Sequence, residues 1–299
     1  MTLAEKLGYE KHAKLLIIHA DDGGFLQAAN KATQRLLENG SITSASYMMP
    51  TPWIYQAARS RAGCPGCDAG VHIVLNSEWP DYRWGSVAPT NKVSSLLDEF
   101  GNLWSSHELY HERAQAEEVI DEIRAQIVKA FKLGFEPSHI DTHMGSIYIK
   151  PEVLEAYVKL AREFKLIPML PKWSEALDDY WRHISWLNGP ALKKLLLAFE
   201  KEHEVMLDRL ILDAGGSSLE ERQENYTRLI KSLAPGLTQL IVHLCDPSGE
   251  FDTIIGHRPQ EKRRYWDAVI LQSERFKEAL ASNGITLINW RDIQKNRYH

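Results

Sequence analysis

Short apolar runs rich in β-branched residues alternate with amphipathic stretches along most of the chain. The apolar runs predict buried strands at residues 15–19, 44–48, 69–75, 138–142, 166–170, 239–244 and 286–289. The amphipathic stretches predict helices at residues 27–39, 53–61, 108–133, 151–164, 219–233 and 260–282. Repeated strand–helix units imply a mostly parallel sheet with right-handed crossovers. We therefore expect an α/β protein whose sheet forms a distorted parallel (β/α) barrel, with an open doubly wound sheet as the alternative.

Two segments lack this regular periodicity. Residues 76–106 contain tryptophans, prolines and glycines with little pattern, and residues 171–216 are the least regular part of the chain. Segments of this length inside a compact enzyme are usually functional loops or caps. Because no low-complexity linker or internal repeat separates the elements, we expect residues 1–299 to form a single domain with two loop insertions.

Composition and charge exclude several classes of protein. A chain of 299 residues can bury a large core, and a net charge of −5 argues against a dedicated nucleic-acid binder. Residues 1–14 lack the continuous apolar run of a secretory signal, and no apolar stretch is long enough to span a bilayer. These features predict a cytoplasmic protein with no nucleic-acid or membrane partner.

The three cysteines do not make a disulfide framework. Cys64-Pro65-Gly66-Cys67 is a C-x-x-C motif, for which a redox role or a zinc site are possible interpretations. A zinc site needs a second pair of ligands, and none lies nearby in the sequence. We favour a turn before the third strand that carries two reduced thiols.

Residues with metal-binding side chains lie in or just after three of the predicted strands. Asp22 follows the first strand, His72 lies in the third and His143 follows the fourth. The carboxyl ends of parallel strands share one edge of a sheet, where α/β proteins build their sites. One carboxylate and two imidazoles are a common open ligand set for a catalytic divalent metal. We predict that these three residues bind one divalent ion, although a lone histidine such as His72 is more often a core residue.

Asp21 precedes the predicted ligand Asp22 directly. Two adjacent carboxylates repel each other in a dry site unless a cation lies between them, and they can then take different tasks. We predict that Asp21 accepts the proton of an attacking water. A solvated turn or a helix cap is the alternative for the pair. Asp141 could orient a histidine ligand, while His139 either belongs to this surrounding shell or is simply packed.

His243 ends the apolar run at residues 239–244. A histidine opposite an activated water is a natural general acid for a departing amine, and a structural histidine at a strand end is the alternative. Asp246 could orient His243, or it could simply start the turn at Pro247.

Tryptophans are frequent in both predicted insertions. Trp79 and Trp84 could stack on the apolar faces of a sugar ring, although filling small cores under the loops is about equally plausible. The basic run that begins at Arg258 could meet an anionic group of the substrate.

Four motifs, taken in order, resemble the YdjC-like carbohydrate deacetylases. They are H-A-D-D-G-G from His19, G-V-H-I from Gly70, H-I-D-T-H-M-G from His139 and I-V-H from Ile241. The resemblance extends over nearly the whole chain, and the combination is more specific than any one motif. The family includes chitooligosaccharide deacetylases and a hopanoid-linked glucosamine deacetylase.

The resemblance implies a distorted β/α barrel with one divalent metal, Mg²⁺ or Zn²⁺, and in many members a homodimer. It carries the ligand roles onto Asp22, His72 and His143, the base onto Asp21 and the acid-side histidine onto His243. Two positions depart from the common pattern, Gly23 after the aspartates and Met144 after the last ligand.

Together, the motifs and the resemblance predict a metal-dependent hydrolase that removes the acetyl group from an N-acetylated sugar. Other metal-dependent barrel hydrolases are one alternative, although a phosphoesterase usually needs a second metal and more ligands than the one set found here. A non-catalytic sugar-binding protein on the same scaffold is the other alternative.

Overall fold

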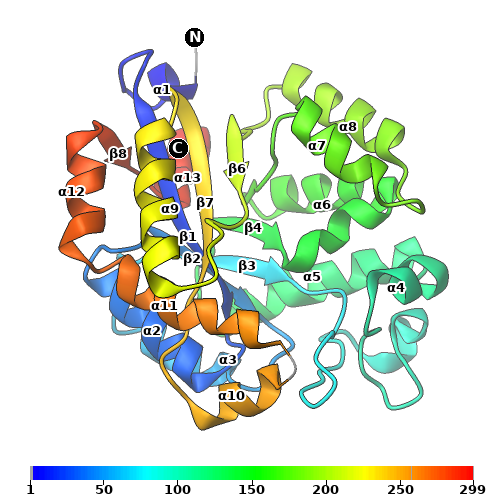
Figure 1. Ribbon diagram of the computed structural model, residues 1–299. Coiled ribbons are helices and arrows are strands. Elements are labelled where there is room, and N and C mark those ends of the chain that lie inside the picture. Colours follow the sequence, from blue (N-terminus) through cyan, green and yellow to red (C-terminus); the bar gives the residue numbers. More distant parts are fainter. Residues whose placement is uncertain (1–2, 257, 299) are drawn as a thin grey trace.

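A curled sheet of parallel strands forms the centre of the molecule (Figure 1). The computed structural model describes residues 3–256 and 258–298. The strands lie in the order β5-β4-β3-β2-β1-β7-β6, and β8 pairs with β1 beside this path. Their bounds are β1 (Lys14–Gly23), β2 (Ser44–Met48), β3 (Gly70–Ile73), β4 (His139–Thr142), β5 (Ile167–Pro168), β6 (Arg209–Ile211), β7 (Gly236–His243) and β8 (Ile285–Leu287). The sheet is an open half-barrel with helices on its outside, which confirms the predicted distorted parallel barrel.

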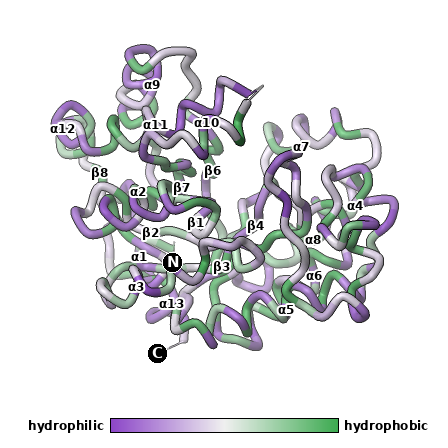
Figure 2. Tube along the Cα trace, turned by 90° about the horizontal axis from the view of Figure 1, so that it is seen from below, coloured by the Kyte–Doolittle hydropathy of each residue, from purple (hydrophilic) through white to green (hydrophobic). Residues whose placement is uncertain are grey.

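The helices fall into two groups on either side of the half-barrel in both views (Figures 1 and 2). One side carries α9 (Leu219–Ser232), α10 (Gly249–Ile255), α11 (Arg263–Ile270) and α12 (Glu274–Ser282), and the other carries α4 (His107–Arg113), α7 (Glu175–Arg182) and α8 (Gly189–Lys201). The remaining helices are α1 (Leu3–Lys6), α2 (Gln27–Glu38), α3 (Ile54–Arg61), α5 (Ala116–Lys132), α6 (Pro151–Glu163) and α13 (Trp290–Tyr298). No helix in the described ranges is both long and apolar enough to cross a membrane.

Strand β1 organises the sheet. Its residues are buried along almost the entire strand, as the apolar sequence predicts. On one edge β7 pairs with β1 from Lys14 to Asp21. The other edge is shared, because β8 pairs with the first residues of β1 and β2 pairs with the last. The end of β1, where the paired aspartates lie, is therefore held between two neighbouring strands.

Two predicted helices are broken. The helix predicted at residues 108–133 is two helices, α4 and α5, because the backbone is extended at Ala114 and Gln115. The helix predicted at residues 260–282 becomes a 3₁₀ turn followed by α11 and α12. Ser273 causes the last break, since its hydroxyl accepts the Phe276 N–H and so starts a new helix.

The two predicted insertions differ in structure. Residues 76–106 contain two short 3₁₀ turns and an isolated β-bridge between Leu97 and Leu103, as expected for a loop. Residues 171–216 contain α7, α8 and β6, so the prediction of an irregular second insertion is wrong. Each helix begins at a polar N-cap, Ser174 or Asn188, a signal for a helix start that periodicity alone does not register. The second segment contacts α4, where Trp186 packs against His111 with ring centroids 5.4 Å apart.

The C-x-x-C motif forms the predicted turn before β3, in which the Cys67 N–H bonds to the carbonyl of Cys64. The two sulfurs are joined in a disulfide, so the prediction of two reduced thiols is wrong. The close sequence spacing already brings the two Cα atoms to 5.4 Å, within the range that a disulfide spans.

Candidate metal centre and active site

Both paired aspartates face the site because the backbone turns between them. Side chains of neighbouring strand residues normally point to opposite faces of a sheet. Asp22 has a left-handed backbone with φ of 61°, and the β1–β2 register shifts between Ala20 and Gly23. Asp and Asn accept this conformation more readily than most residues. The irregular end of β1 therefore places two carboxylates in one site.

Gly23 permits this turn because the chain passes close to β2. A Cβ atom at this position would lie 2.4 Å from Tyr47 Cδ1 and 2.8 Å from the carbonyl oxygen of Ser46. Any larger residue would have to displace the backbone of β2 or the ring of Tyr47. The close approach of β2 thus explains why this chain has glycine after the paired aspartates, where it departs from the common family pattern.

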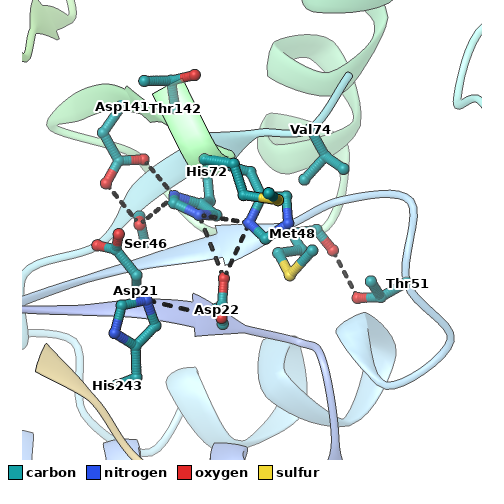
Figure 3. Close-up of polar contacts among 12 residues, drawn as sticks. Asp21, Asp22, Ser46, Met48, Thr51, His72, Val74, Asp141, Thr142 and His243 are labelled. Atoms are coloured by element: carbon teal, nitrogen blue, oxygen red, sulfur yellow. Dashed lines mark hydrogen bonds and ion pairs between the residues drawn. The ribbon is translucent and has the colours of Figure 1, made fainter. Parts of the chain in front are cut away.

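The structure brings together the three predicted ligands. Asp22 Oδ1 lies 3.3 Å from His72 Nε2 and 3.2 Å from His143 Nδ1, and the two nitrogens are 3.3 Å apart. An ion with bonds of about 2.1 Å holds its donors roughly 3.0–3.4 Å apart, so the spacing fits a divalent metal. Asp22 Oδ1 is buried and, within the described residues, accepts no hydrogen bond. Figure 3 shows Asp22 and His72 converging from β1 and β3.

Asp141 lies behind this cluster, on the side of β4 (Figure 3). Its Oδ1 is 2.9 Å from His72 Nδ1, so it orients the His72 ring through the nitrogen that faces away from the cluster. Its Oδ2 accepts from the Ser46 hydroxyl at 2.7 Å and lies 2.8 Å from His19 Nε2. Sequence reasoning did not assign a role to His19 or Ser46, although His19 begins the first of the four motifs that resemble the family.

His139 belongs to the packing beneath the site. Its ring stacks on Trp290 with centroids 5.6 Å apart, and its Nδ1 lies 2.8 Å from the Ser138 hydroxyl. Burial lowers the pKa of His139 to about 4, so the ring is neutral. The packed alternative therefore describes this histidine best.

The charges of the two aspartates differ because their surroundings differ. Burial opposes ionisation of Asp22, but Arg264 and the two histidines outweigh it and hold its pKa well below the usual range. Arg264 Nη1 lies 2.7 Å from Asp22 Oδ2, which leaves Oδ1 facing His72 and His143. Burial raises the pKa of Asp21 to about 7. Asp21 Oδ1 accepts no hydrogen bond from the described residues, and its closest ion-pair neighbour is His19 Nε2 at 3.4 Å.

His243 reaches the site from β7. Its Nε2 lies 3.9 Å from Asp22 Oδ2, and its side chain keeps 26% of its surface exposed, the most of any residue in the cluster. Burial lowers the pKa of His243 to about 3, and Arg264 contributes to the same effect. The ring is therefore uncharged near neutral pH.

Asp246 does not lie at the site. Its carboxylate forms a two-pronged ion pair with Arg35 of α2, at 2.7 and 2.9 Å. Over the described ranges, no hydrogen bond or ion pair joins Asp246 to His243. The role predicted for Asp246 as the orienting group is thus not supported by its position, and it serves instead to connect α2 with the turn after β7.

Residues 76–106 form one wall of the site. Trp79 and Trp84 lie here, but each is only 3% exposed. The Trp84 indole donates to the carbonyl of Asn76, and Arg258 lies 4.6 Å above the Trp79 ring. The tryptophans thus pack inside the wall, as the second interpretation predicts, rather than offering free faces.

Glu78, in the same wall, was missed by sequence reasoning. Its Oε2 lies 3.1 Å from His143 Nε2, on the side of the ring that faces away from Asp22. Burial opposes ionisation of both groups. The facing charges outweigh it, lowering the pKa of Glu78 and raising that of His143 to about 9. The only sequence signal was its place next to Trp79 in a segment without periodicity.

The half-barrel and its cluster define an α/β protein with an aspartate–histidine site at the carboxyl edge of a parallel sheet. The chain belongs to the YdjC-like protein family, whose model matches residues 15–282. A carbohydrate deacetylase from Thermus thermophilus is 36% identical over 251 residues, which is 84% of each chain. A carbohydrate deacetylase from Enterococcus faecalis is 27% identical over 284 residues, covering 94% of this chain and 98% of the relative.

A solved structure has the same fold. A candidate cellobiose-phosphate cleavage protein from Enterococcus faecalis superposes with a TM-score of 0.75 at 24% identity, covering 94% of this chain and 99% of the other. The likeness supports the half-barrel architecture along nearly the full length of the chain.

Proposed function

We propose that this protein is a metal-dependent hydrolase that removes the acetyl group from an N-acetylated sugar. The observation that carries the proposal is the cluster of three donor atoms, from Asp22, His72 and His143, that lie 3.2–3.3 Å apart. A second carboxylate, that of Asp21, lies beside this cluster on the residue that precedes Asp22. Family membership and the names of the deacetylase relatives support the choice of an acetylated sugar as substrate. Asp22, His72 and His143 would hold the ion, which would act as a Lewis acid on the amide carbonyl and on water.

Asp21 would act as the base. It lies beside the cluster formed by Asp22, His72 and His143, and its Oδ1 accepts no hydrogen bond from the part of the chain that the structure describes. A carboxylate in this position can take the proton of the attacking water. His19, 3.4 Å from Asp21 Oδ1, helps to fix its orientation.

His243 would contact the leaving group. It is the most exposed side chain of the cluster and lies on the far side of Asp22 from His72 and His143. Because its ring enters the reaction uncharged, it can donate a hydrogen bond at once but must receive a proton before it can deliver one to the amine. Asp21, after taking the proton of water, is the neighbouring group that can supply it.

An acetate-release assay tests the proposal. The purified protein is incubated with N-acetylglucosamine, its 6-phosphate and short chitooligosaccharides, with Mg²⁺, with Zn²⁺ and after chelation. We expect acetate and free amine in equal amounts from at least one sugar, loss of the reaction on chelation and recovery on adding metal. Phosphate release instead of acetate would indicate a phosphoesterase. Tight sugar binding without any hydrolysis would indicate a non-catalytic sugar-binding protein.

A further inference from the structure

Each of the two histidine ligands has one nitrogen that faces the donor cluster and one that faces away. His72 turns Nε2 toward Asp22, and its Nδ1 meets Asp141 at 2.9 Å. His143 is reversed, since it turns Nδ1 toward Asp22 and leaves Nε2 outside the cluster. A ligand histidine usually donates its outer N–H to a carboxylate, which fixes the orientation of the ring and makes the inner nitrogen more basic.

The outer nitrogen of His143 meets the carboxylate of Glu78. The distance from Nε2 to Glu78 Oε2 is 3.1 Å, close to the value for Asp141 on the other ring. The Glu78 side chain is only 10% exposed, so little water competes for this contact. Both imidazoles therefore have a buried carboxylate on the side opposite the cluster, one from β4 and one from the loop.

We propose that Glu78 is the positioning residue for His143, so that the wall formed by residues 76–106 supplies part of the metal centre. The inference rests on the proposed metal centre. Glu78 acts through His143 and not as a fourth ligand, because it contacts the ring at Nε2, across from the nitrogen that faces Asp22. Its outer contact selects the tautomer of His143 in which Nδ1 is free of a proton and can bind the ion.

The loop is held firmly enough to perform this task. On one side of Glu78, the Trp84 indole donates to the carbonyl of Asn76 at 3.0 Å. Arg258 donates to the carbonyl of Glu78 itself at 3.2 Å and lies above the ring of Trp79. These contacts fix the backbone around Glu78, so its carboxylate can define the direction of the His143 ring.

Zinc titration of three variants tests the inference. Isothermal titration with Zn²⁺ against a competing chelator is carried out on the wild type, Glu78→Ala, Glu78→Gln and Asp81→Asn. Asp81 is an exposed carboxylate of the same loop and serves as the matched control. We expect Glu78→Ala to weaken Zn²⁺ binding by about ten- to a hundredfold, as removal of such outer partners does. Glu78→Gln should lose less, because its amide oxygen can still accept from His143, and Asp81→Asn should match the wild type.

A second measurement separates positioning from a general loss of structure. In the Zn²⁺-loaded protein with ¹⁵N-labelled histidine, the Nε2–H of His143 should exchange slowly in the wild type and quickly in Glu78→Ala. The melting temperature of the metal-free protein should change little in Glu78→Gln. Zn²⁺ affinity equal to wild type in both Glu78 variants would overturn the inference. If Glu78→Ala fails to fold, wild-type affinity in Glu78→Gln overturns it. A wild type that binds no Zn²⁺ would instead contradict the proposed metal centre itself.

Discussion

Asp21 on β1 and His243 on β7 are register partners across two neighbouring parallel strands. Their side chains therefore project from neighbouring positions at the carboxyl ends of β1 and β7. Asp22 joins them only because its left-handed backbone turns its side chain back toward the site. One irregular residue at the end of β1 thus separates the proposed base Asp21 from the proposed metal ligand Asp22 while keeping both within the same site.

Replacing His143 by alanine should reduce metal affinity by roughly tenfold or more, since loss of a ligand should cost at least as much as loss of its outer partner. Isothermal titration with Zn²⁺ and Mg²⁺ measures the effect. His12→Ala is the matched control. His12 is an exposed histidine in the turn before β1, so this variant should bind metal like the wild type. A His143→Ala protein that keeps its full metal content would remove His143 from the ligand set.

Asp21→Asn should preserve the fold and the bound metal but lower kcat by about a hundred- to ten-thousandfold, the usual contribution of a positioned base. Asparagine has the same shape but cannot take a proton at neutral pH. The measurement is the rate of acetate release at saturating substrate, with metal content determined on the same sample. Near-normal kcat in a fully loaded variant would show that another group serves as the base.

Trp84→Ala should lower stability and leave KM nearly unchanged. Trp84 is buried, and its ring packs 6.1 Å from that of Phe25, so its removal should cost roughly 3–5 kcal/mol and several degrees of melting temperature. Phe100→Ala, in the same segment but 82% exposed, is the control and should change stability by at most about 0.5 kcal/mol. A large rise in KM at a temperature where Trp84→Ala is fully folded would restore the sugar-stacking role.

Glu122 should make stability fall with rising pH. This buried carboxyl on α5 accepts the N–H groups of Val87 and Ala88 and the amide of Gln126. Burial nevertheless raises its pKa from 4.5 to about 7. The folded state thus holds the proton more tightly than the unfolded state. Its contribution to the free energy of unfolding, on the order of 3 kcal/mol, is fully present below pH 4.5. This contribution is lost as the pH rises to about 7.

Urea unfolding of wild type and Glu122→Gln at pH 5 and pH 8 isolates this effect. Glutamine cannot ionise, so the stability of the variant relative to wild type should improve at the higher pH. Glu278→Gln, at an exposed position of α12, controls for a simple change in net charge. If the free energies of unfolding of wild type and Glu122→Gln differ by the same amount at pH 5 and pH 8, the prediction is contradicted.

The strands could be predicted where burial makes the sequence continuously apolar, as in β1 and β7. The prediction failed for β6, which has three residues, one exposed and two only partly buried. It also failed where a single local contact decides the outcome, as with the Ser273 cap that divides α11 from α12. Such breaks depend on one hydrogen bond, which periodicity over a long window does not register.

The predicted metal ligands converge because each lies at the end of a strand, and the order of strands in a parallel sheet brings those ends together. Glu78 could not be predicted in this way. It lies in a loop whose path depends on the tertiary contacts of Trp84 and Arg258, and its partner His143 is distant in sequence. Asp246 illustrates the opposite error, because proximity to His243 in sequence suggested a contact that Arg35 makes instead.

The position of β1 has a consequence for the synthesis of the protein. This strand is translated before β7, with which it pairs over most of its length, and before β8, with which it pairs near its start. Until β7 and β8 leave the ribosome, one edge of β1 and its apolar residues have no permanent partner. Nascent chains should therefore remain open to wrong pairing or chaperone binding until both strands have been translated. The proposed active site, with Asp21 on β1 and His243 on β7, forms only when these two strands pair.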